Sequence, residues 1–415
     1  MFEINEEILD EYAKLAVIVG TNVQKGQTLL ITSPIEAYKL VRKCIEVAYK
    51  VGAKEVLVDY YDEKKTILDY SYMDDETLCH YPNWKTMKTK ELIEDDYCTL
   101  SIIGDDPDLL DEIDGEKIKK THIAKMKAVE PYRYYFTNSV GQWSIVAYPE
   151  LNWAKKVFPD IKDDDKALEA LWNAILMTSR VELNKTVSNW QKHDEELFIH
   201  CEKLNEYNFK NLHFKNKIGT DLVVGLIKDH IWQGGKEKAS GKYKVDFNAN
   251  IPTEEVFTMP DCHNINGKVF STKPLSYNGK IIPSFNLAFK DGKVIDYDAL
   301  ENKDVLESIL EADEGSKSLG EVALISYDSP ISKSNILFYD TLFDENASCH
   351  LALGACYPTT VKDGEKLSKD ELYKLGGNKS MNHVDFMFGS EDLEVVGEKE
   401  NGEKILVFKD GNFVI

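Results

Sequence analysis

The chain has 415 residues, 43% of them hydrophobic, and its 72 acidic side chains outnumber its 50 basic ones to give a net charge of -22. A chain of this length is usually too long to fold around a single hydrophobic core, so we expect two domains. The negative charge disfavours nucleic acid and anionic membrane surfaces as partners, because both carry charge of the same sign. No apolar run approaches the length of a membrane span.

The N-terminal segment and the cysteines both favour a cytoplasmic location. The opening residues, MFEINEEILDEY, have neither the basic region nor the apolar region of a signal peptide. The seven cysteines are scattered and form no C-x-x-C pair. We therefore expect buried thiols in a reducing compartment, and neither zinc knuckles nor redox chemistry.

The first hundred residues alternate between strands and helices. Strands are predicted over 27–33 and 54–60, and a third strand begins at Cys98 and ends near residue 104. Between the first two strands, the segment 34–52 opens on a proline and ends on a glycine, as helices do. This order predicts a flavodoxin-like, doubly wound parallel α/β domain over residues 1–110. No G-x-G-x-x-G follows its first strand, so nothing indicates a dinucleotide site.

The middle of the chain has fewer signals. Residues 105–160 are expected to be irregular except for a strand within QWSIVAY. Helices are predicted over 163–179 and 186–205, because apolar residues recur there at helical spacing. The tryptophans in these helices are expected to be core residues, and we assign no role to His193 or His200.

From about residue 208 the chain shows the pattern of an antiparallel β structure. Short runs of alternating apolar and polar residues are separated by dipeptides that favour tight hairpin turns. We therefore expect a larger β-rich domain with inserted helices over 111–415. The hairpin dipeptides are Asn278-Gly279, Asp291-Gly292, Asn401-Gly402 and Asp410-Gly411.

Two polar residues interrupt an apolar run in MNHVDFMFGS, residues 381–390. If the run is a strand, its period of two places His383 and Asp385 on one face. One interpretation is a buried histidine whose hydrogen bond is made by its own carboxylate neighbour. The other is a metal site, which needs further ligands from the same domain.

Three segments of the β-rich region offer such ligands. NIPTEEVFTMPD contains Glu254 and Glu255, LGEVALISY contains Glu321, and NASCHLALGACY contains His350 with Tyr357 after it. Each has a structural alternative: a solvated turn, a strand that starts in water, and a core histidine. The chain has no H-E-x-x-H, so a metal site would have to be assembled from distant strands.

Charge counting is consistent with a site for two cations. Three carboxylates and two neutral histidines would leave one positive charge when two divalent ions bind, and a bridging hydroxide would balance it. Such a site holds a nucleophile at neutral pH and clamps a carbonyl or phosphoryl oxygen.

Several long motifs resemble a known family. PTEEVFT, LGEVALISYDSPIS, LFDENASCHLALGACYP and NHVDFMFGS resemble the metallo-aminopeptidases of the thermophilic aminopeptidase T family (peptidase family M29), particularly its aminopeptidase S and PepS branch. NVQKGQTLLI and VGAKEVLVDY near the N-terminus are similar too. The resemblance covers essentially the whole chain in order.

This resemblance implies an exopeptidase that releases N-terminal amino acids from small unblocked peptides. It also implies two divalent metal ions per subunit (zinc, cobalt or manganese) and a homodimer that encloses its active sites. A metal-bound hydroxide would attack the scissile carbonyl, Tyr357 would help to stabilise the oxyanion, and either Glu254 or Glu321 would transfer the proton. The positions that match the metal ligands of the family are Glu255, Glu321, His350, His383 and Asp385.

Two alternatives to an aminopeptidase remain at this stage. The same metal site could serve a hydrolase of another small amide or of a phosphoester, because fold and metals alone do not choose the substrate. A site that only braces the β-rich domain would be closed, whereas a catalytic site keeps a coordination position open for water.

Overall fold

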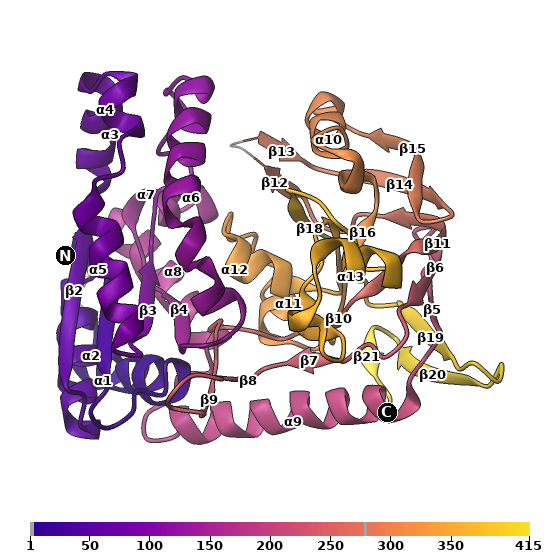
Figure 1. Cartoon of the computed structure of the whole chain (residues 1–415), viewed down its shortest axis with the longest axis horizontal. Coiled ribbons are helices and arrows are strands. Elements are labelled where there is room, and N and C mark those ends of the chain that lie inside the picture. The colour runs from indigo at the N-terminus through magenta and orange to yellow at the C-terminus, as the bar shows by residue number, and fades with distance from the viewer. Residues whose placement is uncertain (1–3, 278–279) are drawn as a thin grey trace. The chain divides into compact units, whose positions relative to one another are not determined.

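The computed structural model describes residues 4–277 and 280–415. The chain forms two compact units, one of residues 1–193 with 236–252 and one of residues 194–235 with 253–415 (Figure 1). The boundary expected after residue 110 lies inside the first unit, because strand β4 (Trp143–Ala147) continues the sheet that begins before it.

A four-stranded parallel sheet forms the centre of the first unit. Its order is β2-β1-β3-β4, which matches the first four strands of a 2-1-3-4-5 doubly wound sheet. Helix α2 (Tyr38–Val51) connects β1 to β2 and ends at Gly52, whose positive φ of 98° suits glycine. The predicted strands and this helix are confirmed. The strands are β1 (Thr28–Pro34), β2 (Glu55–Tyr61), β3 (Cys98–Ile103) and β4.

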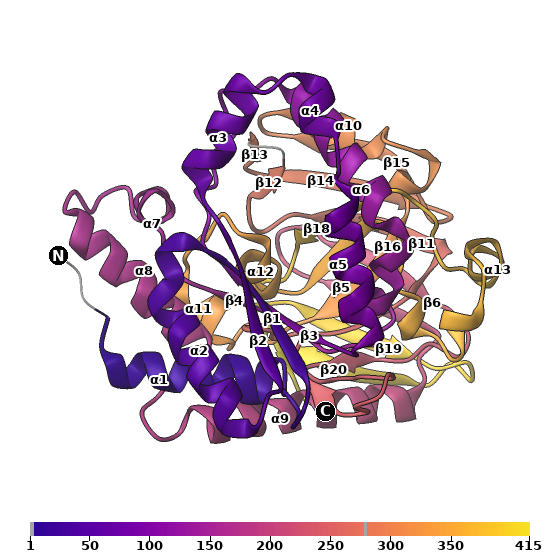
Figure 2. The same cartoon turned by 60° about the vertical axis from the view of Figure 1, so that its left-hand side comes forward.

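Four helices of the first unit bury little of their surface. The expectation that residues 105–160 are irregular outside one strand is wrong for α6, a helix of 23 residues capped by the Asp114 side chain, and for α7 (Leu151–Val157). The only buried residue of α6 is Tyr135, so no apolar stripe revealed this helix in the sequence. Figure 2 shows α3, α4 and part of α6 extending beyond the sheet. We call these helices the helical arm: α3 (Glu63–Tyr72), α4 (Asp75–Cys79), α5 (Asn83–Glu94) and α6 (Gly115–Thr137).

The remaining helices of the first unit pack more closely. Helix α1 (Glu6–Lys14) carries Tyr12, whose buried hydroxyl donates a hydrogen bond of 2.9 Å to the carbonyl of Ala147 in β4. The two helices predicted after residue 160 are confirmed as α8 (Asp164–Thr178) and α9 (Thr186–Tyr207). Helix α9 begins in the first unit and continues into the second from residue 194. Further elements are η1 (Leu15–Gly20), η2 (Ile35–Ala37), α7 (Leu151–Val157), β8 (Glu237–Lys238) and β9 (Asp246–Phe247).

Two antiparallel sheets share one hydrophobic core in the second unit. The five-stranded sheet has the order β18-β17-β16-β10-β7, and the eight-stranded sheet has the order β15-β14-β11-β6-β5-β19-β20-β21. The strands of the smaller sheet are β7 (Gln233–Gly234), β10 (Val256–Thr258), β16 (Leu319–Leu324), β17 (His350–Gly354) and β18 (His383–Met387). Those of the larger are β5 (Asn211–Lys215), β6 (Asp221–Leu226), β11 (Pro260–Phe270), β14 (Phe285–Lys290), β15 (Lys293–Ala299), β19 (Glu394–Glu398), β20 (Lys404–Lys409) and β21 (Asn412–Phe413).

Three of the four predicted hairpins are confirmed. Asp291-Gly292 joins β14 to β15, Asn401-Gly402 lies between β19 and β20, and Asp410-Gly411 joins β20 to β21. Asn278-Gly279 lies outside the described residues. The other elements of this unit are β12 (Leu275–Tyr277), β13 (Lys280–Ile282), α10 (Lys303–Leu310), η3 (Glu314–Lys317), α11 (Pro330–Ser334), α12 (Thr341–Asp344), η4 (Glu345–Ala347), η5 (Pro358–Thr360), η6 (Gly364–Lys366) and α13 (Lys369–Leu375).

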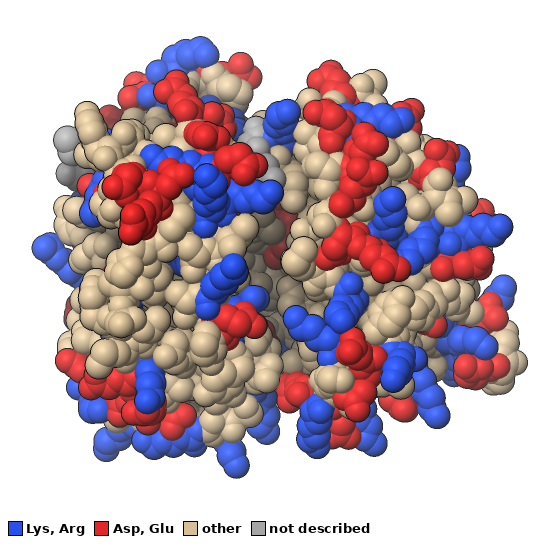
Figure 3. All heavy atoms as spheres, turned by 45° about the horizontal axis from the view of Figure 1, so that its top comes forward, with Lys and Arg blue, Asp and Glu red and all other residues tan. Residues whose placement is uncertain are grey.

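The surface charge is mixed in sign. On the face drawn in Figure 3, lysines and arginines alternate with aspartates and glutamates. None of the helices in the described part of the chain is both long and apolar enough to cross a membrane.

Candidate metal centre

The candidate ligands lie on one face of the five-stranded sheet. Ala352 in β17 pairs with Glu321 in β16 on one side and with Asp385 in β18 on the other. Paired residues point to the same face, so these three form a row across the sheet. His350 and His383 lie two residues from members of this row and share its face. The small side chain of Ala352 leaves room between the two carboxylates.

The opposite face of these strands explains why the fold places the ligands this way. Leu351 and Leu353 alternate with His350 and Ala352 in β17, and Val384 and Phe386 alternate with His383 and Asp385 in β18. All four are buried in the core that the two sheets share. Because the side chains of a strand alternate between faces, burying these apolar residues directs the histidines and Asp385 to the other side.

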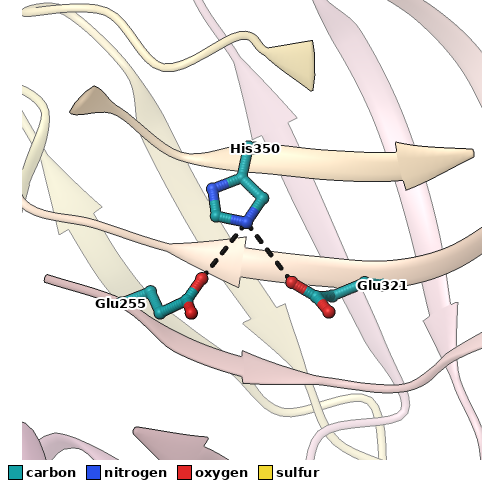
Figure 4. Close-up of side chains that lie close together, drawn as sticks. All are labelled: Glu255, Glu321 and His350. Atoms are coloured by element: carbon teal, nitrogen blue, oxygen red, sulfur yellow. Dashed lines mark hydrogen bonds and ion pairs between the residues drawn. The ribbon is translucent and has the colours of Figure 1, made fainter. Parts of the chain in front are cut away.

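One group of donor atoms contains Glu255, Glu321 and His350 (Figure 4). His350 Nε2 lies 3.2 Å from Glu255 Oε2 and 3.3 Å from Glu321 Oε1. One donor atom from each residue lies within 4.8 Å of the others. Nitrogen and carboxylate oxygens converging at such distances are a suitable donor set for a divalent ion of the first transition row.

A second group of donor atoms contains Glu321, His383 and Asp385. His383 Nε2 lies 3.4 Å from Asp385 Oδ1 and 3.8 Å from Glu321 Oε2. Glu321 therefore belongs to both groups and faces each with a different oxygen. Its carboxylate is thus the one that the two donor groups have in common.

The electrostatics of the centre also fit bound cations. Burial raises the pKa of the Glu321 carboxyl. Burial opposes protonation of His350, yet the hydrogen bonds that its Nε2–H donates to the carboxylates of Glu255 and Glu321 raise its pKa well above the ordinary value. Burial likewise opposes protonation of His383, but the nearby Asp385 raises its pKa to about 10. Without a cation, protons on the histidines thus compensate the buried carboxylates, and a metal ion can replace those protons.

The ring of His383 is held in the orientation that a metal ligand needs. Its Nδ1 lies 2.8 Å from the carbonyl oxygen of Ala355, so Nδ1–H must be the donor. In the neutral ring this leaves the lone pair of Nε2 directed at Asp385 and Glu321. A backbone carbonyl that fixes the tautomer in this way is a common partner of metal-binding histidines.

Tyr357 lies beside the second donor group. Its ring centroid is 4.9 Å from that of His383. The residue is 46% exposed, but burial of its hydroxyl end and the charge of Glu321 raise the pKa of the phenol well above its ordinary value. The hydroxyl therefore stays protonated at neutral pH and is available as a hydrogen-bond donor.

Two further glutamates of this unit, Glu254 and Glu345, belong to neither donor group of the described residues. Glu254 is nevertheless buried. Sequence analysis assigned no role to Glu345, whose pKa is raised well above the ordinary value by burial and by the charges of Asp385 and Glu255. The sequence feature that could have identified Glu345 is its position as the acidic first residue of ENASCH, a run of mostly small residues that ends at His350. The structure thus brings the five expected ligands and Tyr357 together with Glu345.

Comparisons with known proteins find relatives that match nearly the whole chain. Residues 5–413 match the family described as thermophilic metalloprotease (M29). The chain is 42% identical over 408 residues to aminopeptidase 2 of Geobacillus stearothermophilus, covering 98% of each chain. It is 37% identical over 411 residues to aminopeptidase PepS of Streptococcus thermophilus, covering 99% of this chain and 98% of that protein. The structure of wild-type AmpT from Thermus thermophilus superposes with a TM-score of 0.91 at 35% identity, covering 99% of this chain and 100% of that one.

Proposed function

Because the chain belongs to the thermophilic metalloprotease (M29) family and is a metal-dependent aminopeptidase, we propose that two divalent ions act together in its reaction. The proposed substrates are small peptides with a free N-terminal amino group. The observation that carries this proposal is the sharing of Glu321 between two adjacent donor groups.

One ion would be held by Glu255, Glu321 and His350, and the other by Glu321, His383 and Asp385. When bound, the ions supply an activated water as nucleophile and polarise the scissile carbonyl. Zinc, cobalt and manganese all suit a histidine and carboxylate donor set, so the residues do not select among them.

The chain's own residues would carry out the remaining tasks. The Tyr357 hydroxyl would donate a hydrogen bond to the carbonyl oxygen as negative charge develops on it. A carboxylate with a raised pKa holds a transferred proton more firmly than an ordinary carboxylate and can return it to the leaving amine. Both Glu321 and Glu345 have this property. We assign the proton transfer to Glu345 in place of Glu254, because Glu321 is needed as the shared ligand.

The arginines argue against the phosphoesterase alternative. Arg42, Arg133 and Arg180 are the arginines of the chain, and all belong to the first unit. The unit with the donor groups thus has no guanidinium for the bidentate contact that favours phosphate recognition.

The proposal is tested by measuring amino acid release from short peptides. Protein stripped with a chelator and restored with zinc, cobalt or manganese is given unblocked and N-acetylated forms of the same peptide. We expect metal-dependent release of the first residue from the unblocked peptide only. Equal hydrolysis of the acetylated peptide would refute the exopeptidase assignment, and hydrolysis of p-nitrophenyl phosphate alone would favour the phosphoesterase.

We also propose that the protein is a homodimer that uses the helical arm. Helices α3 and α4 bury no residue, and the arm exposes large apolar side chains, which include Leu68, Tyr72, Trp84 and Met87. Large apolar side chains exposed on helices that bury little of their own surface are typical of interaction surfaces. The double substitution of Trp84 and Met87 to Glu should produce monomers in analytical ultracentrifugation. Leu300→Glu, at an exposed apolar residue of the other unit, is the control and should leave the mass unchanged.

A cytoplasmic location is proposed from the cysteines. All seven are free thiols in the structure. Burial raises the pKa of Cys44, Cys98, Cys201 and Cys349, which keeps these thiols in their unreactive protonated form. Such usage suits a reducing compartment.

A further inference from the structure

The segment that carries Glu255 is buried before any regular element begins. Thr253 and Glu254 are less than a tenth exposed, and neither belongs to a helix or strand. Buried backbone groups outside regular elements must find other hydrogen-bond partners. The N–H of Glu254 finds its partner in the side chain of Asn346, whose Oδ1 accepts it at 2.8 Å.

Asn346 is itself fixed at both ends of its carboxamide. The residue is 0% exposed and lies in η4, between Glu345 and His350 in the chain. Its Nδ2 donates to the carbonyl of Leu342 at 3.1 Å. The carboxamide therefore joins the segment that bears Glu345 and His350 to the segment that bears Glu255.

This bridge completes the fixation of Glu255. On its C-terminal side, Val256 pairs with Leu324 of β16 and with Gly234 of β7. On its N-terminal side, the preceding N–H is held by Asn346. With its backbone fixed on both sides, the Glu255 carboxylate lies 3.2 Å from His350 Nε2.

We propose that Asn346 is a positioning residue of the metal centre, which sets the place of Glu255 relative to His350 and so contributes to metal affinity. The inference rests on the proposed function, because it takes Glu255 and His350 as ligands. Residues that orient metal ligands through hydrogen bonds typically change metal affinity about 10–100-fold when they are substituted.

A purely structural role makes a different prediction. A carboxamide that only stabilises the fold would change the free energy of unfolding and leave the metal affinity of the folded protein unaltered. Asn412 of the same unit is a matched control. Its Oδ1 accepts the N–H of Asp328 at 2.9 Å, and its Nδ2 donates to the carbonyl of Asp410 at 2.8 Å. None of these residues belongs to a donor group.

The test is metal binding by the full-length protein. Chelator-treated wild type, Asn346→Ala and Asn412→Ala are titrated with Zn²⁺ against a chromophoric chelator, and separately with Co²⁺ while its absorption spectrum is recorded. We expect Asn346→Ala to bind Zn²⁺ about 10–100-fold more weakly with an altered Co²⁺ spectrum. Asn412→Ala should match the wild type. Wild-type affinity in Asn346→Ala would overturn the inference.

A second variant covers the case in which Asn346→Ala does not fold. Asn346→Asp keeps an acceptor for the Glu254 N–H and adds a negative charge near the cations, but it loses the donor to the Leu342 carbonyl. Its metal affinity should therefore stay within about tenfold of that of the wild type. An affinity more than about tenfold weaker in this variant would overturn the inference. The proposed function fails separately: Glu255→Gln with wild-type metal affinity would refute the metal centre itself.

Discussion

Replacing Glu321 with Gln should have opposite effects on the metal-free protein and on the active enzyme. Gln keeps the size of the side chain and removes its charge. Glu321 is 4% exposed and faces His350 and His383 with separate oxygens. Because it is the residue common to both donor groups, its loss should weaken both metal positions.

The expected magnitudes follow from this placement. Residues one step removed from a metal change its affinity by about 10–100-fold, so loss of a shared ligand should lower kcat/KM at least about 100-fold. In the metal-free protein the raised pKa means that the charged carboxylate opposes folding at neutral pH. Each unit of such a shift corresponds to about 1.4 kcal/mol, so the metal-free variant should be more stable than metal-free wild type at pH 7.

The sign of the pH dependence provides a further check. A raised folded-state pKa costs stability only above the unfolded-state value, which is about 4.3 for Glu. The stability advantage of Glu321→Gln should therefore be absent near pH 4 and grow as the pH rises through the folded pKa.

Urea unfolding of chelator-treated proteins and peptide hydrolysis after metal restoration measure the two effects. Glu394→Gln is the control, because Glu394 is an exposed glutamate at the start of strand β19. The control should match the wild type in both assays. Full activity of Glu321→Gln with restored metal would refute the shared-ligand assignment, and a less stable metal-free variant would refute the electrostatic reasoning.

Three further predictions concern the phenol, the histidines and the core. Tyr357→Phe should lower kcat by about 10²–10³-fold with little change in KM, as expected for a lost oxyanion donor. A change confined to KM would contradict this role. The control Tyr373→Phe, in α13, should behave as the wild type. Because the pKa of His383 is about 10 in the metal-free protein, Zn²⁺ binding at pH 7 should release protons, and the affinity should increase as the pH rises. Calorimetry in buffers of different ionisation enthalpy measures the released protons. An affinity that does not depend on pH would contradict this reasoning. Leu353→Ala should lower the free energy of unfolding by about 2–5 kcal/mol, because Leu353 is buried on the core face of β17. A loss below about 1 kcal/mol in urea unfolding would show that this face is not tightly packed.

The sequence alone predicted those features of the structure that depend on residues close together in the chain. The period of two in HVDFM placed His383 and Asp385 on one face, and the Asp-Gly and Asn-Gly dipeptides marked hairpins that the structure contains. Helix α6 was missed because such signals require an apolar stripe, and this helix buries only Tyr135. The segments that bear Glu255, Glu321 and His350 were candidates for ligands from their residues alone, and the resemblance to a family selected the ligands among them.

Tertiary structure decided which of these residues meet. The row formed by Glu321, Ala352 and Asp385 depends on the register of three strands that are separated in sequence. That register is set by burial of apolar residues on the opposite face, a non-local effect that no single segment contains. For the same reason the chain alone could not separate Glu255 from Glu254 by position, nor place Glu345 near Asp385. Local periodicity selects the face of a strand, whereas pairing and packing select its neighbours.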